Sequence, residues 1–259
     1  MPTTPWRRWA PHAPLAAIVA LYLATAAAYA WRVPILEGAD EHGHALVVQH
    51  VSIHGSPPRI GTLWEAVQPP LYYAVAAAVH GAAGGGRIVP STLRLNDGFR
   101  FDDPSSADAF DPRSYAPADA RPARRLRALS MLFGALTLGC VYATALAVSR
   151  GRRLVAWSAA ALPALTPMYA QHHAVITNDS LATLWCAVVV WLLARHVMAG
   201  AAAPGAGGGV GGSGGTARQA VGMGIAAGLG IWTKLTMAPV AAAAAAVLLV
   251  WGPGPAAAR

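Results

Sequence analysis

Leu126–Val148, LRALSMLFGALTLGCVYATALAV, decides the fold class, because it is predominantly apolar and Arg127 is its only charged residue. A helix needs about 20 such residues to cross the roughly 30 Å core of a bilayer. Further apolar segments lie on both sides of this one. They are Pro14–Trp31, Leu154–Ala170, Leu181–Val197 and Ala220–Trp251. The pattern predicts an all-α polytopic membrane protein with five to six transmembrane helices.

The composition also indicates a membrane protein. Of the 259 residues, 55% are hydrophobic and 12% are charged, whereas roughly a quarter of the residues of a soluble domain are charged. This balance excludes a disordered chain, a collagen-like repeat and a disulfide scaffold. The net charge of +8 comes from arginines that flank the apolar segments. Such arginines determine membrane topology, so no nucleic-acid partner is expected.

The charges and apolar segments divide the chain into six parts. Ten of the eleven acidic residues lie between Glu37 and Asp119, which predicts a large polar loop after the first helix. Arg7 and Arg8 place the N-terminus in the cytoplasm. The parts are a cytoplasmic N-terminus with the first transmembrane helix (1–31), an extracytoplasmic loop with juxtamembrane helices (32–123), three transmembrane helices (124–198), a Gly-rich cytoplasmic linker (199–218), a final membrane segment (219–251) and a tail (252–259) at which the chain is expected to be truncated.

Pro69–Ala83, PPLYYAVAAAVHGAA, is predicted to lie along the membrane surface. Fifteen residues of helix reach only about 22 Å, which is short for a crossing. A crossing here would also place the basic turn Arg150–Arg153 outside the cell, against the positive-inside rule. That alternative stays open because residues 84–127 are themselves rich in arginine. The aromatic residues Trp64, Tyr72 and Tyr73 are expected at the level of the lipid headgroups.

Lys234 is the only lysine of the chain, beside eighteen arginines, and it lies inside the longest apolar run. Ala220–Trp251 has 32 residues, too many for one ordinary crossing of roughly 17–25 residues. A polar break at Lys234, followed by Pro239, favours two short helices over one long tilted helix, although both remain open. A cation at membrane depth is a functional-site hypothesis by default.

Three acidic residues stand at the ends of apolar segments. Asp40 and Glu41 follow the first helix, and Asp179 is the only acid after Asp119. Each has a structural alternative, because Asp40 and Asp179 also suit the N-cap of a helix and Glu41 suits its first turn. Together with His44, the first pair could also hold a divalent metal ion, so a metal cofactor stays open.

Five motifs occur in an order that resembles the N-terminal half of the GT-C-type glycosyltransferases. This class uses polyprenyl-phosphate sugars and includes the protein O-mannosyltransferases and the lipid A aminoarabinose transferases. The motifs are GADEHGHALVVQH (38–50), WEAVQPPLYY (64–73), RRLRALSMLFGALTLGCVYATAL (124–146), ALPALTPMYAQHHAVITNDSLATL (161–184) and GIAAGLGIWTKLTMAPV (224–240). The resemblance covers most of the chain, although the relatives usually continue for several more helices.

The resemblance implies sugar transfer from a polyprenyl phosphate to an acceptor hydroxyl outside the cell, by a multi-pass protein of the plasma membrane. It makes Asp40 the catalytic acid, with Glu41 beside it and Asp179 as a second acid. Residues implied to bind the donor are Glu65, Gln68, Tyr72 and Lys234. Some relatives carry a cation where this chain has Gln68, which weakens the case for phosphate binding there.

Two other functions remain open from the sequence. The chain could be a catalytically inactive subunit that keeps the fold and binds membrane lipids. It could also be a component of a transporter, because Lys234 and Asp179 lie within or beside predicted crossings. The lack of a second, symmetry-related half counts against transport.

Overall fold

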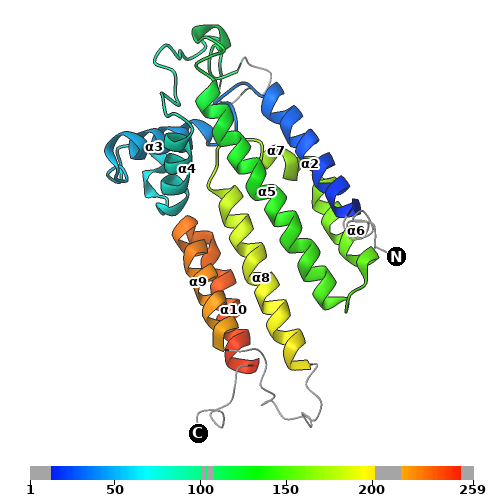
Figure 1. The fold of residues 1–259 in the computed structure, drawn as a ribbon. Coiled ribbons are helices and arrows are strands. Elements are labelled where there is room, and N and C mark those ends of the chain that lie inside the picture. Colours follow the sequence, from blue (N-terminus) through cyan, green and yellow to red (C-terminus); the bar gives the residue numbers. More distant parts are fainter. Residues whose placement is uncertain (1–12, 101–102, 104–107, 202–216, 252–259) are drawn as a thin grey trace.

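The computed structural model describes residues 13–100, 103, 108–201 and 217–251. Every regular element in these residues is a helix (Figure 1), so the prediction of an all-α fold is confirmed. The elements are α2 (Ala13–Arg32), α3 (Glu41–His54), η1 (Trp64–Val67), α4 (Leu71–Ala82), η2 (Pro112–Ser114), α5 (Arg121–Val148), α6 (Arg153–Ala164), α7 (Pro167–His172), α8 (Asp179–Ala201), α9 (Ala217–Thr233), η3 (Leu235–Met237) and α10 (Ala238–Trp251).

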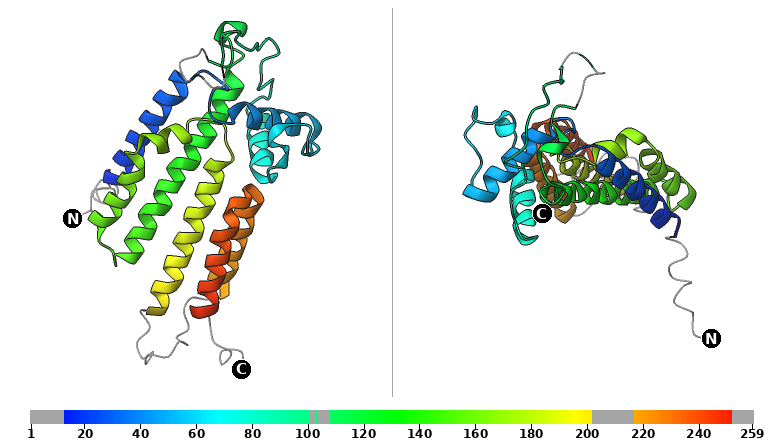
Figure 2. Two further views of the ribbon diagram at one scale, coloured as in Figure 1. Left: turned by 180° about the vertical axis from the view of Figure 1, so that it is seen from behind. Right: turned by 90° about the horizontal axis from the view of Figure 1, so that it is seen from above.

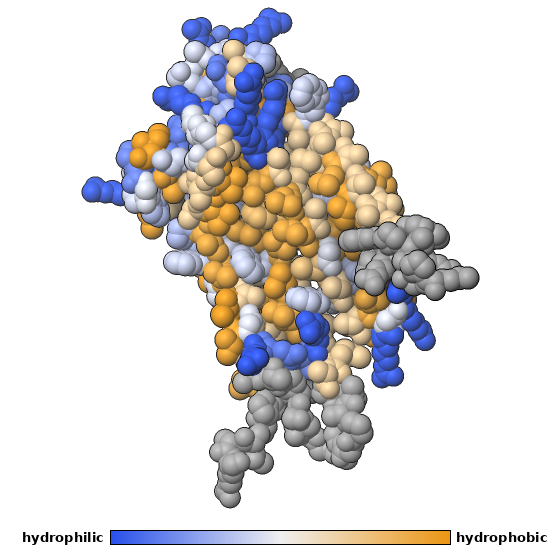
Figure 3. Space-filling model, viewed as in Figure 1, coloured by the Kyte–Doolittle hydropathy of each residue, from blue (hydrophilic) through white to orange (hydrophobic). Residues whose placement is uncertain are grey.

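Three helices are long and apolar enough to cross a membrane: α2, α5 and the first 21 residues of α8. Little of each apolar stretch is buried in the protein, between 11% and 28%, so most of their surface is free to contact lipid. Figure 3 shows an apolar band between hydrophilic ends of the molecule. These features indicate a membrane protein. The other predicted crossings fall on helices too short to qualify by length.

The helices form an elongated layer, with α3 and α4 at one end and α2 and α6 at the other (Figure 2). The long helix α5 packs against α6 and α8, and α9 and α10 pack against the other side of α8. α3, α4 and the other described residues between α2 and α5 lie toward the ends of the helices that are drawn uppermost in Figure 1. The α7–α8 connection and the α9–α10 junction lie toward the same end.

One predicted segment differs from the structure near a proline, and another is divided in two as predicted. The expected crossing Leu154–Ala170 is two helices, because α6 ends at Ala164 and α7 begins at Pro167. A proline removes a backbone donor and disfavours helical backbone in the residue before it. Ala220–Trp251 contains two helices rather than one: α9 ends at Thr233, and Lys234 has extended backbone at φ −157°.

The short helix α4 lies over the upper end of α9 and packs against α3 and α5 (Figure 1). Its two aromatic residues, Tyr72 and Tyr73, are 0% and 1% exposed, so their side chains do not face the lipid headgroups. They belong to the core between α3, α4 and α5. The exposed aromatic residue of this region is Trp64 in η1, at 85%.

Gly134 allows α2, α5 and α7 to approach one another closely. A Cβ atom at this position would overlap Tyr22 Oη and lie 2.8 Å from His173 Cδ2. The Tyr22 hydroxyl donates to the Met131 carbonyl at 3.1 Å, and the Tyr169 hydroxyl donates to the Gly134 carbonyl at 2.7 Å. The absence of a side chain here is therefore a packing requirement.

Replacing Gly134 with Ala is expected to destabilise the protein by about 1–3 kcal/mol, because overpacking forces neighbouring groups to move. Gly139 on the same helix provides the control, since a Cβ there would meet nothing within 4 Å. Gly139→Ala should stabilise α5 by up to about 1 kcal/mol through helix propensity. Thermal unfolding in detergent measures both. Equal melting temperatures for the two variants would contradict the packing argument.

Candidate functional site

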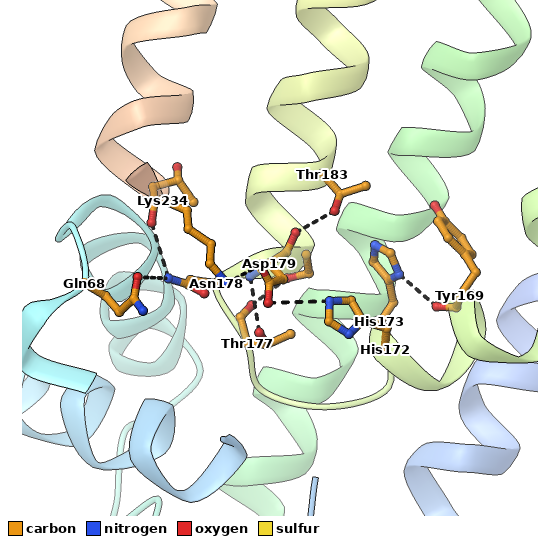
Figure 4. A network of polar contacts seen from close by, with 11 residues as sticks. Gln68, Tyr169, His172, His173, Thr177, Asn178, Asp179, Thr183 and Lys234 are labelled. Carbon is orange, nitrogen blue, oxygen red and sulfur yellow. Dashed lines mark hydrogen bonds and ion pairs between the residues drawn. The ribbon is translucent and has the colours of Figure 1, made fainter. Parts of the chain in front are cut away.

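Asp179 is the centre of a polar cluster at the start of α8 (Figure 4). Lys234 Nζ donates to Asp179 Oδ1 at 2.5 Å, and His172 Nε2 lies 3.7 Å from Asp179 Oδ2. The break between α9 and α10 brings Lys234 to this point, and the end of α7 supplies His172. The side chains of Asp179 and Lys234 remain 32% and 21% exposed, so the pair lies at an accessible edge of the bundle.

Asn178 joins the segment before α4 to the end of α9. Its amide nitrogen donates to Gln68 Oε1 at 3.2 Å and to the Thr233 carbonyl at 3.4 Å. Asn178 is fully buried, and Thr233 is the residue before Lys234. The side chain therefore links Gln68 to the end of α9, next to the lysine.

A cavity of about 200 Å³ lies beside this cluster. Asp40 and Asp179 line it from two segments far apart in the sequence, together with His172 and Thr177. A third acid, Glu37, also lines the cavity, but its carboxylate accepts the backbone N–H groups of Ala109 and Phe110 at 3.1 and 2.6 Å. Glu37 is thus bound to its own loop, whereas Asp179 is paired with Lys234 and the Asp40 side chain makes no capping hydrogen bond.

Asp40 holds an unusual backbone conformation. It is in the left-handed region at φ 57°, directly before α3, and its side chain makes no capping hydrogen bond. Aspartate tolerates this region better than most residues do. The side chain is exposed and lines the cavity, so the alternative that Asp40 caps α3 through its carboxylate does not hold.

Glu41 lies in a different environment, in an ion pair with Arg127 of α5. Arg127 Nε and Nη2 donate to its two oxygens at 2.7 and 2.6 Å. The remaining guanidinium donors reach the carbonyls of Ala30 and Val33 at 2.7 and 2.8 Å and of Pro34 at 2.7 Å. All five donors of Arg127 are thus bound, and both side chains are at most 1% exposed.

The Glu41 carboxylate also accepts two backbone N–H groups. Ile176 donates to Oε1 at 3.0 Å and Gly38 donates to Oε2 at 3.2 Å. This ion pair therefore holds together the end of α2, the start of α3, α5 and the segment before α8. Glu41 is not among the residues that line the cavity, and sequence spacing gave no sign of a partner 86 residues away.

Glu65 and His44 are buried close to the cluster. Burial raises the pKa of Glu65; a hydrogen bond with Gln68 lowers it in part, and the nearby Asp40 carboxylate raises it. His44 Nδ1 lies 2.9 Å from the Tyr73 hydroxyl, and burial lowers its pKa to about 4. His44 is therefore neutral near pH 7.

The His44 pKa predicts a pH dependence of stability. The unfolded chain takes up a proton at this residue near pH 6.5, whereas the folded protein does so only near pH 4. Stability should therefore fall between pH 6.5 and pH 4, by up to about 3 kcal/mol from this residue. His44→Gln keeps a polar group next to Tyr73 and removes the titration.

Melting temperatures measured between pH 7 and pH 4.5 test this prediction. The melting temperature of His44→Gln should fall less steeply with decreasing pH than that of the wild type. The control is His54→Gln, because His54 is exposed on the same helix. If the melting temperature of His44→Gln depends on pH as steeply as that of the wild type, His44 is not the source of the pH dependence.

Within the described residues, no three His, Cys, Asp or Glu side chains come close enough to hold a metal ion. The suggested set of Asp40, Glu41 and His44 is therefore not assembled, because Glu41 is bound by Arg127 and His44 by Tyr73. Tyr72 lies in the core at 0% exposure, so no donor molecule reaches it in this structure.

The structure brings most of the predicted site together. Asp40 and Asp179 share the cavity, Lys234 contacts Asp179, and Gln68 is joined to the cluster through Asn178. Two contributors were not predicted, Asn178 and His172. Both stand within seven residues of Asp179 in the motif QHHAVITND, so the polar character of that motif was the available signal.

No protein-family model, curated protein or solved structure matches the chain significantly.

Proposed function

We propose that the chain is a membrane glycosyltransferase, or its N-terminal half, that moves a sugar from a polyprenyl phosphate to a hydroxyl group outside the cell. The observation that carries the proposal is the cavity shared by Asp40 and Asp179, beside the only lysine and at one end of the apolar helices. A donor with its chain in the membrane would present its head group at such a place.

In this proposal the acceptor oxygen attacks the anomeric carbon of the sugar. The bond from that carbon to the phosphate oxygen breaks, and polyprenyl phosphate leaves with the electron pair. Asp40 takes the proton of the acceptor hydroxyl as general base. Lys234 stabilises the negative charge that develops on the departing phosphate, and Asp179 holds the lysine in position.

The topology that goes with this function has the N-terminus in the cytoplasm and the cavity outside. α2, α5 and α8 are the long crossings, and we assign shorter crossings to α6 with α7, to α9 and to α10. The turn between α5 and α6 carries Arg150 and Arg152, and Arg153 begins α6; this turn lies at the opposite end of the bundle from the α7–α8 connection (Figure 1). Cytoplasmic arginines at this turn agree with the positive-inside rule.

A direct assay tests the proposal. The purified chain in lipid nanodiscs is given a polyprenyl phosphate carrying a radiolabelled hexose, and the release of polyprenyl phosphate and of labelled sugar is followed. Turnover above that of empty nanodiscs supports the enzyme. If neither product is released with any tested sugar, the alternative of an inactive subunit remains. In that case the Lys234–Asp179 ion pair would be a structural contact only.

Lys234→Met separates phosphate binding from a structural role. The variant should bind n-butyl phosphate about tenfold more weakly or worse, because a charged hydrogen bond to the phosphate is lost. Its melting temperature should change little. Lys234→Arg keeps the charge and should retain most of the affinity. A large fall in melting temperature with unchanged phosphate affinity would assign Lys234 to structure alone.

A further inference from the structure

Four exposed arginines lie at the adjacent ends of α2 and α5. Arg32 is the last residue of α2, and Arg121, Arg124 and Arg125 belong to the first turns of α5. On α5 they are three and four residues apart, so their side chains lie on one face of the helix. The end of α2 and the start of α5 therefore form a basic patch, which consists of these four residues.

Trp31 places this basic patch at the level of the lipid headgroups. The Arg124 guanidinium lies over the Trp31 ring, 5.1 Å from its centroid, and Trp31 is 75% exposed. Tryptophan is enriched where spanning helices meet the headgroups. An arginine that stacks on a ring keeps its N–H donors at the edge of the guanidinium, where they can bind a phosphate group.

The length of α5 leads to the same level. The helix has 28 residues, whereas about 20 are enough to cross the hydrocarbon core of a bilayer. Its other end, at Val148, is followed directly by the charged turn with Arg150 and Arg152. About eight residues at the start of α5, or about 12 Å of helix, therefore project beyond the core. The three arginines of α5 lie in this part.

The charge of the basic patch is not compensated by the part of the chain that the structure describes. No carboxylate of these residues forms an ion pair with any of the four guanidinium groups. Asp119, the acid nearest to Arg121 in the sequence, accepts the backbone N–H of Ala116 at 3.2 Å. Arg125 Nη1 donates to the Ala83 carbonyl at 2.5 Å, which leaves its positive charge without a counter-ion. The patch is therefore suited to an anionic partner.

Along the same face of α5, the arginines are followed by exposed apolar residues. Arg121 and Arg125 are succeeded by Ala128, Leu132 and Leu136 at intervals of three or four residues, and all five are exposed. Such positions lie on one side of a helix. The leucines, at 51% and 48% exposure, lie within the candidate span. Figure 3 shows hydrophilic side chains at the upper end of α5, above the apolar band. A lipid whose chains contact the leucines would therefore have its headgroup beside the arginines.

We propose that Arg121, Arg124 and Arg125 bind the phosphate groups of anionic phospholipids, whose acyl chains cover the exposed leucines of α5. A planar guanidinium matches two oxygens of a phosphate group. Phosphatidylglycerol should be preferred to phosphatidylcholine, because the choline cation compensates the phosphate charge of the latter. The inference requires that α2 and α5 span a membrane, and it does not depend on sugar transfer.

The test uses the purified chain in nanodiscs of equal parts phosphatidylglycerol and phosphatidylcholine. One of the two lipids at a time carries a diazirine on its acyl chain close to the headgroup, and crosslinks to residues 128–136 are quantified by mass spectrometry. Phosphatidylglycerol should label this segment about tenfold more than phosphatidylcholine or better. Arg124→Gln should lower the preference about fivefold, the ratio that one basic residue near an anionic surface contributes. Replacing all three arginines of α5 with Gln should bring it close to one.

Two further variants are controls. Arg124→Lys keeps the charge and should retain most of the preference for phosphatidylglycerol. Arg152→Gln removes the same charge from the turn at the other end of α5, where Arg152 is exposed. This variant should not change the labelling of residues 128–136. If the triple variant does not fold, Arg124→Gln and these two controls carry the test.

Several results would overturn the proposal. Equal labelling by the two lipids in the wild type, or an unchanged preference in Arg124→Gln, would show that the arginines do not bind lipid phosphate. Loss of labelling when free glycerol 3-phosphate is added would assign the arginines to a soluble anion instead. Protection of residues 128–136 from both lipids in a dimeric chain would show that a second copy covers this face.

Discussion

Asp40→Asn should lower the rate of sugar transfer by about 10²–10⁴-fold, the usual contribution of a positioned general base. Asparagine has nearly the same shape and also tolerates the left-handed backbone conformation of Asp40. The side chain makes no capping hydrogen bond that the change would break. The melting temperature should therefore stay close to that of the wild type, and the loss should appear in turnover rather than in the amount of folded protein.

Asp97→Asn is the control for this variant, because Asp97 is an exposed acid of the same loop and does not line the cavity. It should keep full activity. Initial rates of sugar transfer from a labelled donor in nanodiscs measure the activity of both variants. If Asp40→Asn turns over at the wild-type rate, the catalytic base is another group, and Asp179 would be the next carboxylate to replace.

The second large effect concerns stability. Arg127→Met is expected to destabilise the protein by about 3–5 kcal/mol, because it leaves the Glu41 carboxylate buried without its partner. Glu41→Gln should cost a similar amount, since the guanidinium would then lack a counter-charge. The double variant should cost less than the sum of the two, because neither charge is left alone.

Arg121→Met provides the matched control, since Arg121 is exposed in the first turn of the same helix. This substitution should change the free energy of unfolding by less than about 0.5 kcal/mol. Thermal unfolding in detergent gives all four values. Additive costs for Glu41→Gln and Arg127→Met would show that the two side chains do not act as a pair. A small cost for each would show that the protein does not depend on this contact.

Features with a local cause could be predicted from the sequence. The apolar lengths predicted α2, α5 and α8, because a membrane span needs a long unbroken run. The polar residues around Lys234 predicted the break between α9 and α10, since an extended residue in an apolar run needs partners for its backbone. The position of Asp179 at the start of α8 followed from the same local pattern.

Features that depend on distant contacts could not be predicted in this way. Arg127 was one of several arginines beside apolar segments, and only the fold shows that it is buried against Glu41. Tyr72 has a polar tip suited to a membrane surface, yet α4 turns it toward α3 and α5. Without such contacts, the sequence could not distinguish Glu41 in its ion pair from Asp40, which lines the cavity.

All five donors of Arg127 reach acceptors that precede it in the chain, so a ribosome has already made every partner when α5 emerges. The first loop can therefore be fastened to α2 and α5 while α6 to α10 are still unmade. The Ile176 N–H, synthesised 49 residues after Arg127, then meets a carboxylate that is already in place. On this order of synthesis, the early half of the protein is already in place when α8 starts to fold, and Asp179 is the last of the three acids to reach the cavity.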